Sequence, residues 1–450
     1  MTRARHSRSI EPVDLCLAQR ALPVDSNSRR VYQKRMSKIT SNLRPELLTL
    51  LYAFIGVAIA TSDALPGETR LWTIGKPIVT YWAGPAMTDA TARQMAEGGF
   101  NLVWCTEKEL DVAQRHGLRA LLHDGLISPA SLDAPEQREK LETLINRVRS
   151  HPAMYAYFIT DEPSAAAFPS LGKLTAFLRE RDPAHMAYIN LFPTYANNDQ
   201  LGTKGDVVTA YAEHLNRFVA EVKPALLSYD HYQFRAQGDG DQYFLNLAMI
   251  RRAAQRANVP FLNIVQACTW TPSMRVPTPD EVRYLVYTTA AYGAQGISYY
   301  VYCHPGHTGG IALPDGTPTP LYHALKTLNR QFAAIAGQLQ NLESIGVYHT
   351  TFKEQGCEPV PENSAFRIES KAGASDGDRG FLLGFFGRAN KPSHVVVVNL
   401  DYRSTKTAAV VGPADMERFD ADAERWVPAN GRRHQLALEP GGGAMFRVKL

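Results

Sequence analysis

The stretch "MYAYFITDEP", residues 154–163, gives the strongest indication of the fold. An apolar run rich in aromatic and β-branched residues is typical of a buried strand. This run ends on two adjacent carboxylates, Asp161 and Glu162, with Pro163 directly after them. The sequence therefore predicts a buried strand whose end carries paired acids.

Similar short apolar runs recur on both sides of this one. They cover residues 76–84, 100–106, 118–125, 187–195, 226–234, 260–270 and 296–306. Helix signals separate them, such as the capping box from Thr278 to Glu281, which has proline at the first helical position and leads to Gly293. Eight strands that alternate with helices over about 250 residues predict a (β/α)8 barrel.

The pattern changes after about residue 343. Short runs with strand character follow, separated by Gly, Pro, Asn and Asp and without a helical period, at 345–350, 380–387, 394–401, 407–412, 416–431 and 443–450. This pattern predicts an antiparallel β-sandwich. We therefore expect the barrel over residues 61–343 and the sandwich over 344–450.

The first 60 residues do not belong to this pattern. Residues 1–35 are polar and basic, and Met36 opens a basic segment followed by the apolar stretch 47–60, which ends on small residues. This order predicts a secretory signal peptide, with translation starting at Met36, a mature chain from Thr61, and a secreted or periplasmic protein. The alternative is a membrane anchor, but roughly 14 apolar residues fall short of the ~20 that span a bilayer. We expect no stable anchor after cleavage.

Charge and cysteine content exclude several classes of function. The formal charge is +4, but residues 1–60 carry ten Lys and Arg against four Asp and Glu, so the mature chain carries about −2. This balance predicts no nucleic-acid partner. The cysteines after residue 60, at 105, 268, 303 and 357, are widely spaced and form no CxxC motif, which disfavours a metal site or a disulfide scaffold. Buried free thiols and a bridge between Cys268 and Cys303 both remain open.

In a barrel of this kind, the C-terminal ends of the strands form the active-site face. Polar and aromatic residues that we expect at this level, besides Asp161 and Glu162, are Tyr81, Trp82, Glu107, His123, Asp124, Asn190, Tyr229, Asp230, His231, Tyr232, Gln266, Trp270, Tyr300, His304 and His307. Aromatic faces stack on sugar rings, carboxylates and amides bind hydroxyls, and two acids hydrolyse a glycosidic bond. This set of aromatic and carboxylate residues predicts a carbohydrate substrate and chemistry that needs no cofactor.

The order of elements resembles the clan A glycoside hydrolases, whose fourth strand ends in Asn-Glu-Pro or a close variant. The "TDEP" at 160–163 matches this motif with Asp161 in place of Asn. The segments "AYGAQGISYYVY" (291–302) and "LEPGGGAMFRVKL" (438–450) resemble secreted bacterial β-galactosidase-like enzymes of glycoside hydrolase families 42 and 2. The likeness covers roughly residues 75–450. It implies a secreted glycosidase that uses Glu162 as general acid.

The sequence departs from that family at the seventh strand, where the resemblance requires a second Glu as nucleophile. The chain offers Gln266 there, and an amide cannot attack an anomeric carbon. The best substitute is Asp230 in "SYDHY", followed by Asp124 and then by Asp161, which we expect to point away from its neighbour Glu162 or to orient it. We expect Glu162 to be the general acid, with a raised pKa, and Asp230 to be the nucleophile or base.

Several of these residues have a structural interpretation too. Asp161 fits a helix N-cap. A zinc site is one interpretation of the three histidines His231, His304 and His307. The favoured interpretation is that they are hydrogen-bonded polar residues of loops. We assign Trp72 and Trp104 to packing or to the domain interface.

Two further functional classes remain open from the sequence. The missing seventh-strand acid fits a carbohydrate-binding barrel without turnover. A polysaccharide lyase or transglycosylase is the other alternative. A lyase that acts on uronic acids needs a cation for the substrate carboxylate, and the strand ends offer Arg235 alone.

Overall fold

The computed structural model describes residues 71–370, 379–429 and 431–449. The predicted extension and signal peptide over residues 1–60 lie outside this part of the chain. The described residues fall within one compact unit, Thr69–Leu450. Among them, no helix has the length and apolar character needed to cross a membrane.

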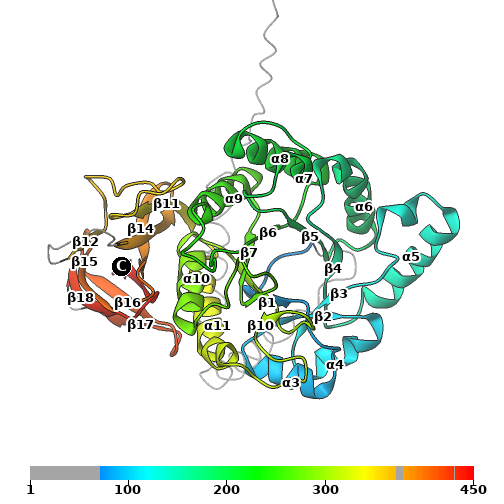
Figure 1. The fold of residues 1–450 in the computed structure, drawn as a ribbon, viewed down its shortest axis with the longest axis horizontal. Coiled ribbons are helices and arrows are strands. Elements are labelled where there is room, and N and C mark those ends of the chain that lie inside the picture. The colour runs from blue at the N-terminus through cyan, green and yellow to red at the C-terminus, as the bar shows by residue number, and fades with distance from the viewer. Residues whose placement is uncertain (1–70, 371–378, 430, 450) are drawn as a thin grey trace, which may run out of the picture. The chain divides into compact units, whose positions relative to one another are not determined.

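Eight parallel strands form the central sheet, as the apolar runs predict (Figure 1). They are β1 (Ile78–Trp82), β2 (Leu102–Cys105), β3 (Arg119–Leu122), β4 (Met154–Asp161), β5 (Met186–Leu191), β6 (Leu227–His231), β7 (Phe261–Gln266) and β9 (Gly296–Tyr300). Their order is β1-β9-β7-β6-β5-β4-β3-β2, so consecutive strands of the barrel lie side by side. The prediction of a (β/α)8 barrel is confirmed.

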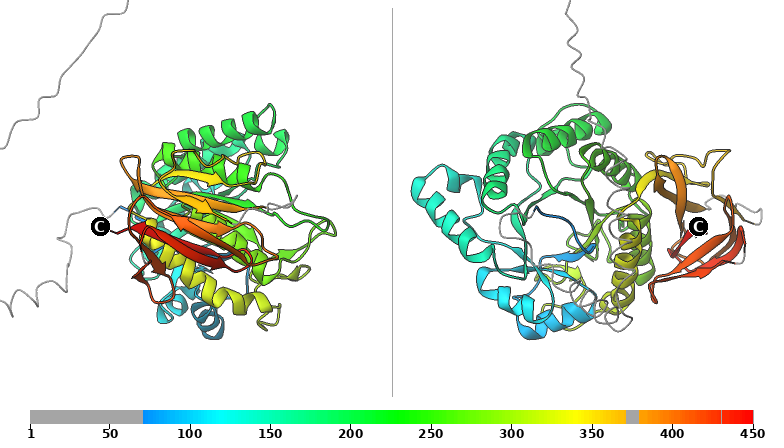
Figure 2. Two further views of the ribbon diagram at one scale, coloured as in Figure 1. Left: turned by 90° about the vertical axis from the view of Figure 1, so that its left-hand side faces the viewer. Right: turned by 180° about the vertical axis from the view of Figure 1, so that it is seen from behind.

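Helices surround this sheet (Figures 1 and 2). They are α3 (Asp89–Glu97), α4 (Leu110–Arg115), α5 (Pro135–Val148), α6 (Phe168–Arg181), α7 (Asn198–Leu201), α8 (Val207–Val222), α9 (Tyr243–Ala257), α10 (Pro279–Ala291) and α11 (Pro320–Leu339), with short 3-10 turns at Glu107–Glu109, Pro129–Leu132 and Ala165–Ala167. Helix α10 begins at the predicted capping box, since the Thr278 side chain accepts a hydrogen bond from the Glu281 backbone.

No regular ladder joins the described strands β1 and β2, which are bridged by a backbone hydrogen bond from Asn101 to Val79 at 3.0 Å and by side chains. Asn101 accepts a hydrogen bond from the Val79 backbone at 3.0 Å and donates one to the Pro77 carbonyl at 2.9 Å. Nearer the C-terminal ends, the Trp104 indole donates to the Tyr81 carbonyl at 2.8 Å. Trp104 therefore joins two strands, in keeping with the packing role predicted for it.

The residues after α11 form antiparallel sheets. The six-stranded sheet has the order β11-β13-β14-β19-β16-β17 and the three-stranded sheet the order β12-β15-β18. The strands are β11 (Glu343–His349), β12 (Arg367–Glu369), β13 (Phe381–Arg388), β14 (Lys391–Asn399), β15 (Lys406–Val411), β16 (Met416–Asp420), β17 (Arg425–Pro428), β18 (Arg433–Leu438) and β19 (Gly443–Val448). This all-β region is the one that the change of pattern predicts.

Strand alternation lets β13 serve two cores. Phe381, Leu383 and Phe385 join the core between the two antiparallel sheets, whereas Leu382 and Phe386 join the larger core that includes the barrel helices. Gly384 lies against α10 so closely that an added Cβ would lie 2.0 Å from the carbonyl oxygen of Ala291. The six-stranded sheet is therefore packed directly on the barrel.

Candidate active site

Three carboxylates gather at the C-terminal ends of neighbouring strands. Asp161 is the last residue of β4, Glu162 follows it, and Asp230 lies in β6. All three line one cleft with a volume of about 330 Å³. The structure thus brings together the three acids that the sequence proposes for catalysis.

A β-bulge explains why adjacent acids share the cleft. The register between β4 and β5 shifts between Phe158 and Thr160, so that Asp161 pairs with Asn190. Without the extra residue, strict alternation from the inward-facing Phe158 would direct Asp161 away from the barrel interior. Glu162 then takes a left-handed backbone conformation, with φ of 43°, and its amide donates to the Asn190 carbonyl at 2.9 Å. Of the two expectations for Asp161, that it points away from Glu162 or orients it, the first is not met, because both residues line the cleft.

A buried amide supports two of the acids from below. The Asn190 side chain donates to Asp161 at 3.0 Å and lies 3.5 Å from an oxygen of Asp230. Its own oxygen accepts a hydrogen bond from the Ser228 hydroxyl at 3.0 Å, and Tyr188 lies 2.7 Å from that hydroxyl. Asn190 is only 2% exposed, so it orients the carboxylates and does not line the cleft.

Glu162 and Asp230 interact with each other, and the interaction shifts the pKa of both carboxyl groups. Burial raises the pKa of Glu162 well above its ordinary range, and the charges of Asp230 and Asp161 raise it further. Burial also raises the pKa of Asp230, but a hydrogen bond from Tyr232 favours its ionised form. Of the two groups, Glu162 therefore holds its proton more tightly, and Asp230 ionises first as the pH rises.

The separation of two catalytic carboxyl groups depends on how the glycosidic bond is cleaved. Carboxyl groups that act through an intervening water are typically about 6.5–9.5 Å apart, while a carboxylate that attacks the sugar directly lies about 5–5.5 Å from the acid. The direct interaction between Glu162 and Asp230 favours the shorter separation.

Aromatic rings form one wall of the cleft. Tyr232 packs against Trp270 and Tyr300 with ring centroids 4.9 and 5.1 Å away, and Trp270 lies 4.8 Å from Tyr300. Trp270 is 38% exposed, so part of its ring is open to a ligand. Exposed aromatic faces of this kind stack on sugar rings.

Six of the seventeen residues that the sequence places at the active-site face line the cleft: Asp161, Glu162, Asp230, Tyr232, Trp270 and Tyr300. The sequence interpretation did not assign seven further lining residues to it: Phe192, Pro193, Tyr195, Ala196, Gln200, Arg235 and Met274. All seven lie in or next to the segments after β5, β6 and β7. The apolar runs 187–195 and 226–234 extend into two of these segments, which is a signal for Tyr195.

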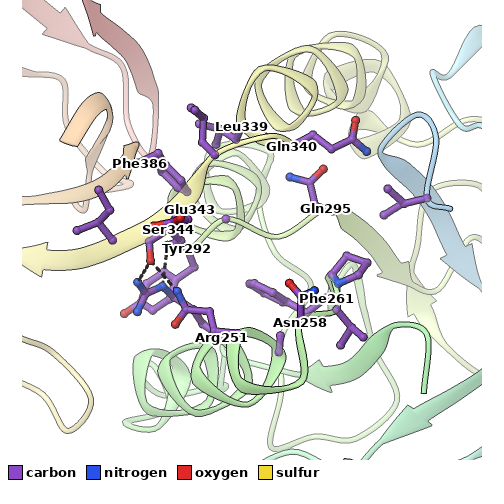
Figure 3. A pocket seen from close by; sticks show the side chains of 18 of the residues that line it. Arg251, Asn258, Phe261, Tyr292, Gln295, Leu339, Gln340, Glu343, Ser344 and Phe386 are labelled. Atoms are coloured by element: carbon purple, nitrogen blue, oxygen red, sulfur yellow. Dashed lines mark hydrogen bonds between the residues drawn. The ribbon is translucent and has the colours of Figure 1, made fainter. Parts of the chain in front are cut away.

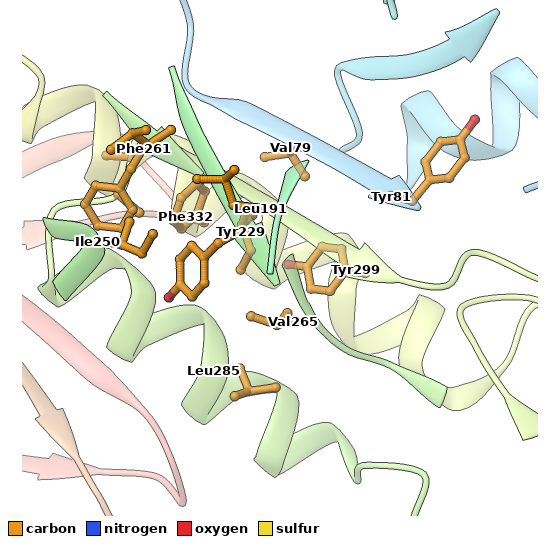
Figure 4. Packing of buried hydrophobic residues seen from close by; sticks show 14 of the residues in the cluster. Val79, Tyr81, Leu191, Tyr229, Ile250, Phe261, Val265, Leu285, Tyr299 and Phe332 are labelled. Atoms are coloured by element: carbon orange, nitrogen blue, oxygen red, sulfur yellow. The ribbon is translucent and has the colours of Figure 1, made fainter. Parts of the chain in front are cut away.

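Three proposed residues face the helices instead. Figure 4 shows Tyr81 and Tyr229 among residues of the packing cluster. Like Tyr229, His231 lies on the face of β6 opposite Asp230, and its ring nitrogen is 3.0 Å from the Asn246 side chain of α9. The structure does not bring these three to the cleft.

Four more proposed residues also lie outside the cleft lining. Gln266 is fully buried, and its amide accepts from the Phe234 backbone at 2.8 Å and donates to the Arg275 carbonyl at 2.8 Å. It therefore holds two loops together. Trp82 packs against Trp104 and Phe158, His123 lies against Trp104, and Asp124 accepts a hydrogen bond from the Leu126 backbone.

The structure also bears on the N-cap, zinc-site and disulfide interpretations of the sequence. The cap of the 3-10 turn after β4 is Ser164, not Asp161. The rings of His304 and His307 pack together with their centroids 4.3 Å apart, and Nε2 of His307 lies 3.2 Å from the Tyr300 hydroxyl. In the described part of the chain, no group of three or more His, Cys, Asp or Glu is arranged to hold a metal. The four described cysteines are free, so Cys268 and Cys303 are not bridged.

A second cavity, of about 540 Å³, lies at the opposite ends of the strands (Figure 3). It is lined by residues before β7 and β9, such as Asn258 and Gln295, and by Arg251, which is hydrogen-bonded to Ser344. Glu343 is the one acid among its described lining residues. Because the N-terminal face of such barrels serves stability, we place the chemistry in the cleft with the acids.

Comparisons with known proteins give likenesses of structure alone. No protein-family model matches the chain, and no curated protein matches its sequence. A glycoside hydrolase family 5 protein from Bacteroides vulgatus matches 84% of this chain and 95% of its own, with 11% identity and a TM-score of 0.51. A protein described as a glycoside hydrolase matches 84% and 98%, with 12% identity and a TM-score of 0.50.

A β-galactosidase from a psychrophilic Marinomonas also matches, with 12% identity and a TM-score of 0.41. That match covers 58% of this chain and only 60% of the β-galactosidase. At such identities the two longer matches support the fold, a parallel eight-stranded barrel of the kind found in glycoside hydrolases. Membership of families 42 and 2 stays a prediction.

Proposed function

We propose that this protein is a glycoside hydrolase that cleaves O-glycosidic bonds with Glu162 and Asp230. The observation that carries the proposal is that these two acids, from the ends of β4 and β6, line one aromatic-walled cleft and interact with each other. Their environments separate their roles, because burial and neighbouring charges hold the proton on Glu162 while Tyr232 favours the ionised form of Asp230. The likeness of the fold to glycoside hydrolases is consistent with this chemistry.

The proposed reaction has two steps. First, the Asp230 carboxylate attacks the anomeric carbon while Glu162 gives its proton to the leaving oxygen, so that a glycosyl ester forms on Asp230. Second, Glu162, now a carboxylate, takes a proton from water as the water oxygen attacks the same carbon and releases Asp230. Two inversions at one carbon retain its configuration.

The third acid has a supporting role in this scheme. Asp161 is held by Asn190 and is exposed. Its charge raises the pKa of both Glu162 and Asp230. We propose that it also binds a sugar hydroxyl and that the protein acts outside the cytoplasm on a polysaccharide or its oligosaccharides, as its N-terminal sequence suggests.

The test is release of sugar from polysaccharides and aryl glycosides by the chain from Thr61 and by variants E162Q and D230N. We expect turnover that falls by about 100-fold or more in each variant, as is typical for loss of a general acid or a nucleophile. The control is D124N, because Asp124 is a strand-end acid outside the cleft. Binding without turnover would instead support a carbohydrate-binding barrel, and an unsaturated uronide product would show a lyase.

A further inference from the structure

One cation lines the cleft among the described residues, and it is Arg235. Its guanidinium carbon lies 5.3 Å from the centre of the Tyr195 ring, which also lines the cleft. No carboxylate of the described chain lies within 4.0 Å of its nitrogens, although Asp161, Glu162 and Asp230 line the same cleft. Arg235 thus presents a positive charge that no acid of this cleft neutralises by direct contact.

The backbone that carries Arg235 is held in place on both sides. The Arg235 amide donates to the Gly238 carbonyl at 3.2 Å, and Arg235 pairs with Met274 in an antiparallel bridge. The next amide, of Ala236, donates to the Ser273 carbonyl at 2.8 Å. The segment after β6 is therefore fastened to the segment after β7, and the guanidinium position is set by the fold.

A clamp from the all-β region fixes the same segment a few residues further on. Asp239 accepts hydrogen bonds from Arg379 and from the Tyr402 hydroxyl, both at 2.6 Å. Arg275, in the segment after β7, lies 3.6 Å from the other oxygen of Asp239. Asp239 is thus used by structural partners and does not neutralise Arg235.

Electrostatics indicates which ligand such an arginine suits. The acids of the cleft bind neutral hydroxyl groups, but they repel an anionic sugar. A guanidinium is planar, remains charged, and can donate two parallel hydrogen bonds to a carboxylate or sulfate group. A neutral sugar needs no such partner, whereas an anionic sugar needs it to enter this cleft.

We propose that Arg235 recognises an anionic substituent, a carboxylate or a sulfate ester, on the sugar that the cleft binds. This rests on the proposed function only in that the cleft binds carbohydrate, and it does not depend on turnover. Arg235 is then a specificity residue, which selects uronic acid or sulfated sugars over their neutral counterparts.

The test is a binding titration, by calorimetry, with matched pairs of methyl glycosides in both anomeric forms. The pairs are glucuronoside and glucoside, galacturonoside and galactoside, and sulfated and unsulfated galactoside. They are titrated into the full chain and its R235Q variant. The control is R388Q, at an exposed arginine at the end of β13. The uronide and sulfate arms distinguish the two sources of the anion.

We expect the wild type to bind the anionic member of at least one pair about tenfold or more tightly, as is usual for a hydrogen-bonded charge pair. R235Q should lose that preference and still bind the neutral member, which also shows that the variant is folded. Equal binding of both members by the wild type, equal loss of both in R235Q, or failure of every anionic glycoside to bind would overturn the proposal.

The outcome is independent of hydrolysis. An anion preference that depends on Arg235, without turnover of any glycoside, would contradict the proposed catalysis and leave this recognition intact. Turnover of neutral glycosides without any anion preference would contradict the recognition by Arg235 and leave the proposed catalysis intact.

Discussion

Replacing Glu162 by Gln should stabilise this protein at alkaline pH. Burial and two neighbouring acids raise the pKa of Glu162 in the folded chain. The folded state therefore binds this proton more tightly than the unfolded state does. The free energy of unfolding falls as the pH rises from about 4.3, the ordinary value of a Glu, up to the raised pKa. Gln carries no such proton, so the variant avoids this loss.

The size of the effect follows from the shift. One pKa unit corresponds to about 1.4 kcal/mol. Because the Glu162 side chain is only half-buried, solvent screens part of the interaction. We therefore take a pKa difference of about one to two between the folded and the unfolded chain. At a pH above the raised pKa, this difference lowers the free energy of unfolding of the wild type by about 1.4 to 2.7 kcal/mol. An unfolding entropy of about 2.1 cal/mol/K per residue over roughly 380 residues converts this into a rise in Tm of about 2 to 3 °C.

The assay is thermal unfolding of the wild type and E162Q at about pH 4 and at about pH 9, which bracket the titration. The matched control is E139Q, at an exposed position in α5. We expect E162Q and the wild type to unfold together at the lower pH, and the variant to be the more stable protein at the higher pH. A Tm difference that is the same at both pH values would refute the reasoning.

Three further predictions concern the surroundings of the acid pair. Y232F removes a hydrogen bond that favours ionised Asp230, so the acidic limb of the pH–rate profile should move up by about one unit, and an unmoved limb would contradict this. D239N leaves Arg379 and Arg275 without their shared charge and should lower the free energy of unfolding by about 3 kcal/mol, as measured in urea; an unchanged midpoint would show that the clamp is dispensable. W270A removes an exposed ring of the cleft wall and should raise KM about tenfold with a smaller change in kcat, whereas a loss confined to kcat would argue against stacking.

The sequence is sufficient to predict the barrel, because each strand is a local apolar run bounded by helix signals. The capping box at Thr278 is equally local and is confirmed. Placing acids at the ends of β4 and β6 also needs only the position of each strand. These features depend on residues close together in the chain.

The direction of side chains within a strand is predicted less completely. For Tyr229 and His231, which we expected at the site, alternation from Asp230 is sufficient and places both on the opposite face of β6, toward the helices. The same rule fails at Asp161, because the bulge in β4 is set by pairing with β5 and has no local signal.

Long-range contacts account for the remaining differences. Gln266 occupies the expected strand end, but its amide is taken up by backbone groups of two loops. Arg235 and Tyr195 reach the cleft from loops whose conformation depends on partners far away in the sequence. Apart from the apolar run 187–195, which extends to Tyr195, periodicity and local motifs do not indicate such contacts.

The most direct test of the central claim is rescue of two truncated variants by azide, with an aryl glycoside that the wild type cleaves. E162A keeps the nucleophile, so azide should attack the glycosyl ester and give a glycosyl azide of retained configuration. D230A lacks the nucleophile, so azide should attack the substrate directly and give the inverted configuration. Rescue with these two configurations is the predicted result. Turnover of D230A without azide at the wild-type rate, or the two configurations exchanged between the variants, would contradict the assignment of Glu162 as acid and Asp230 as nucleophile.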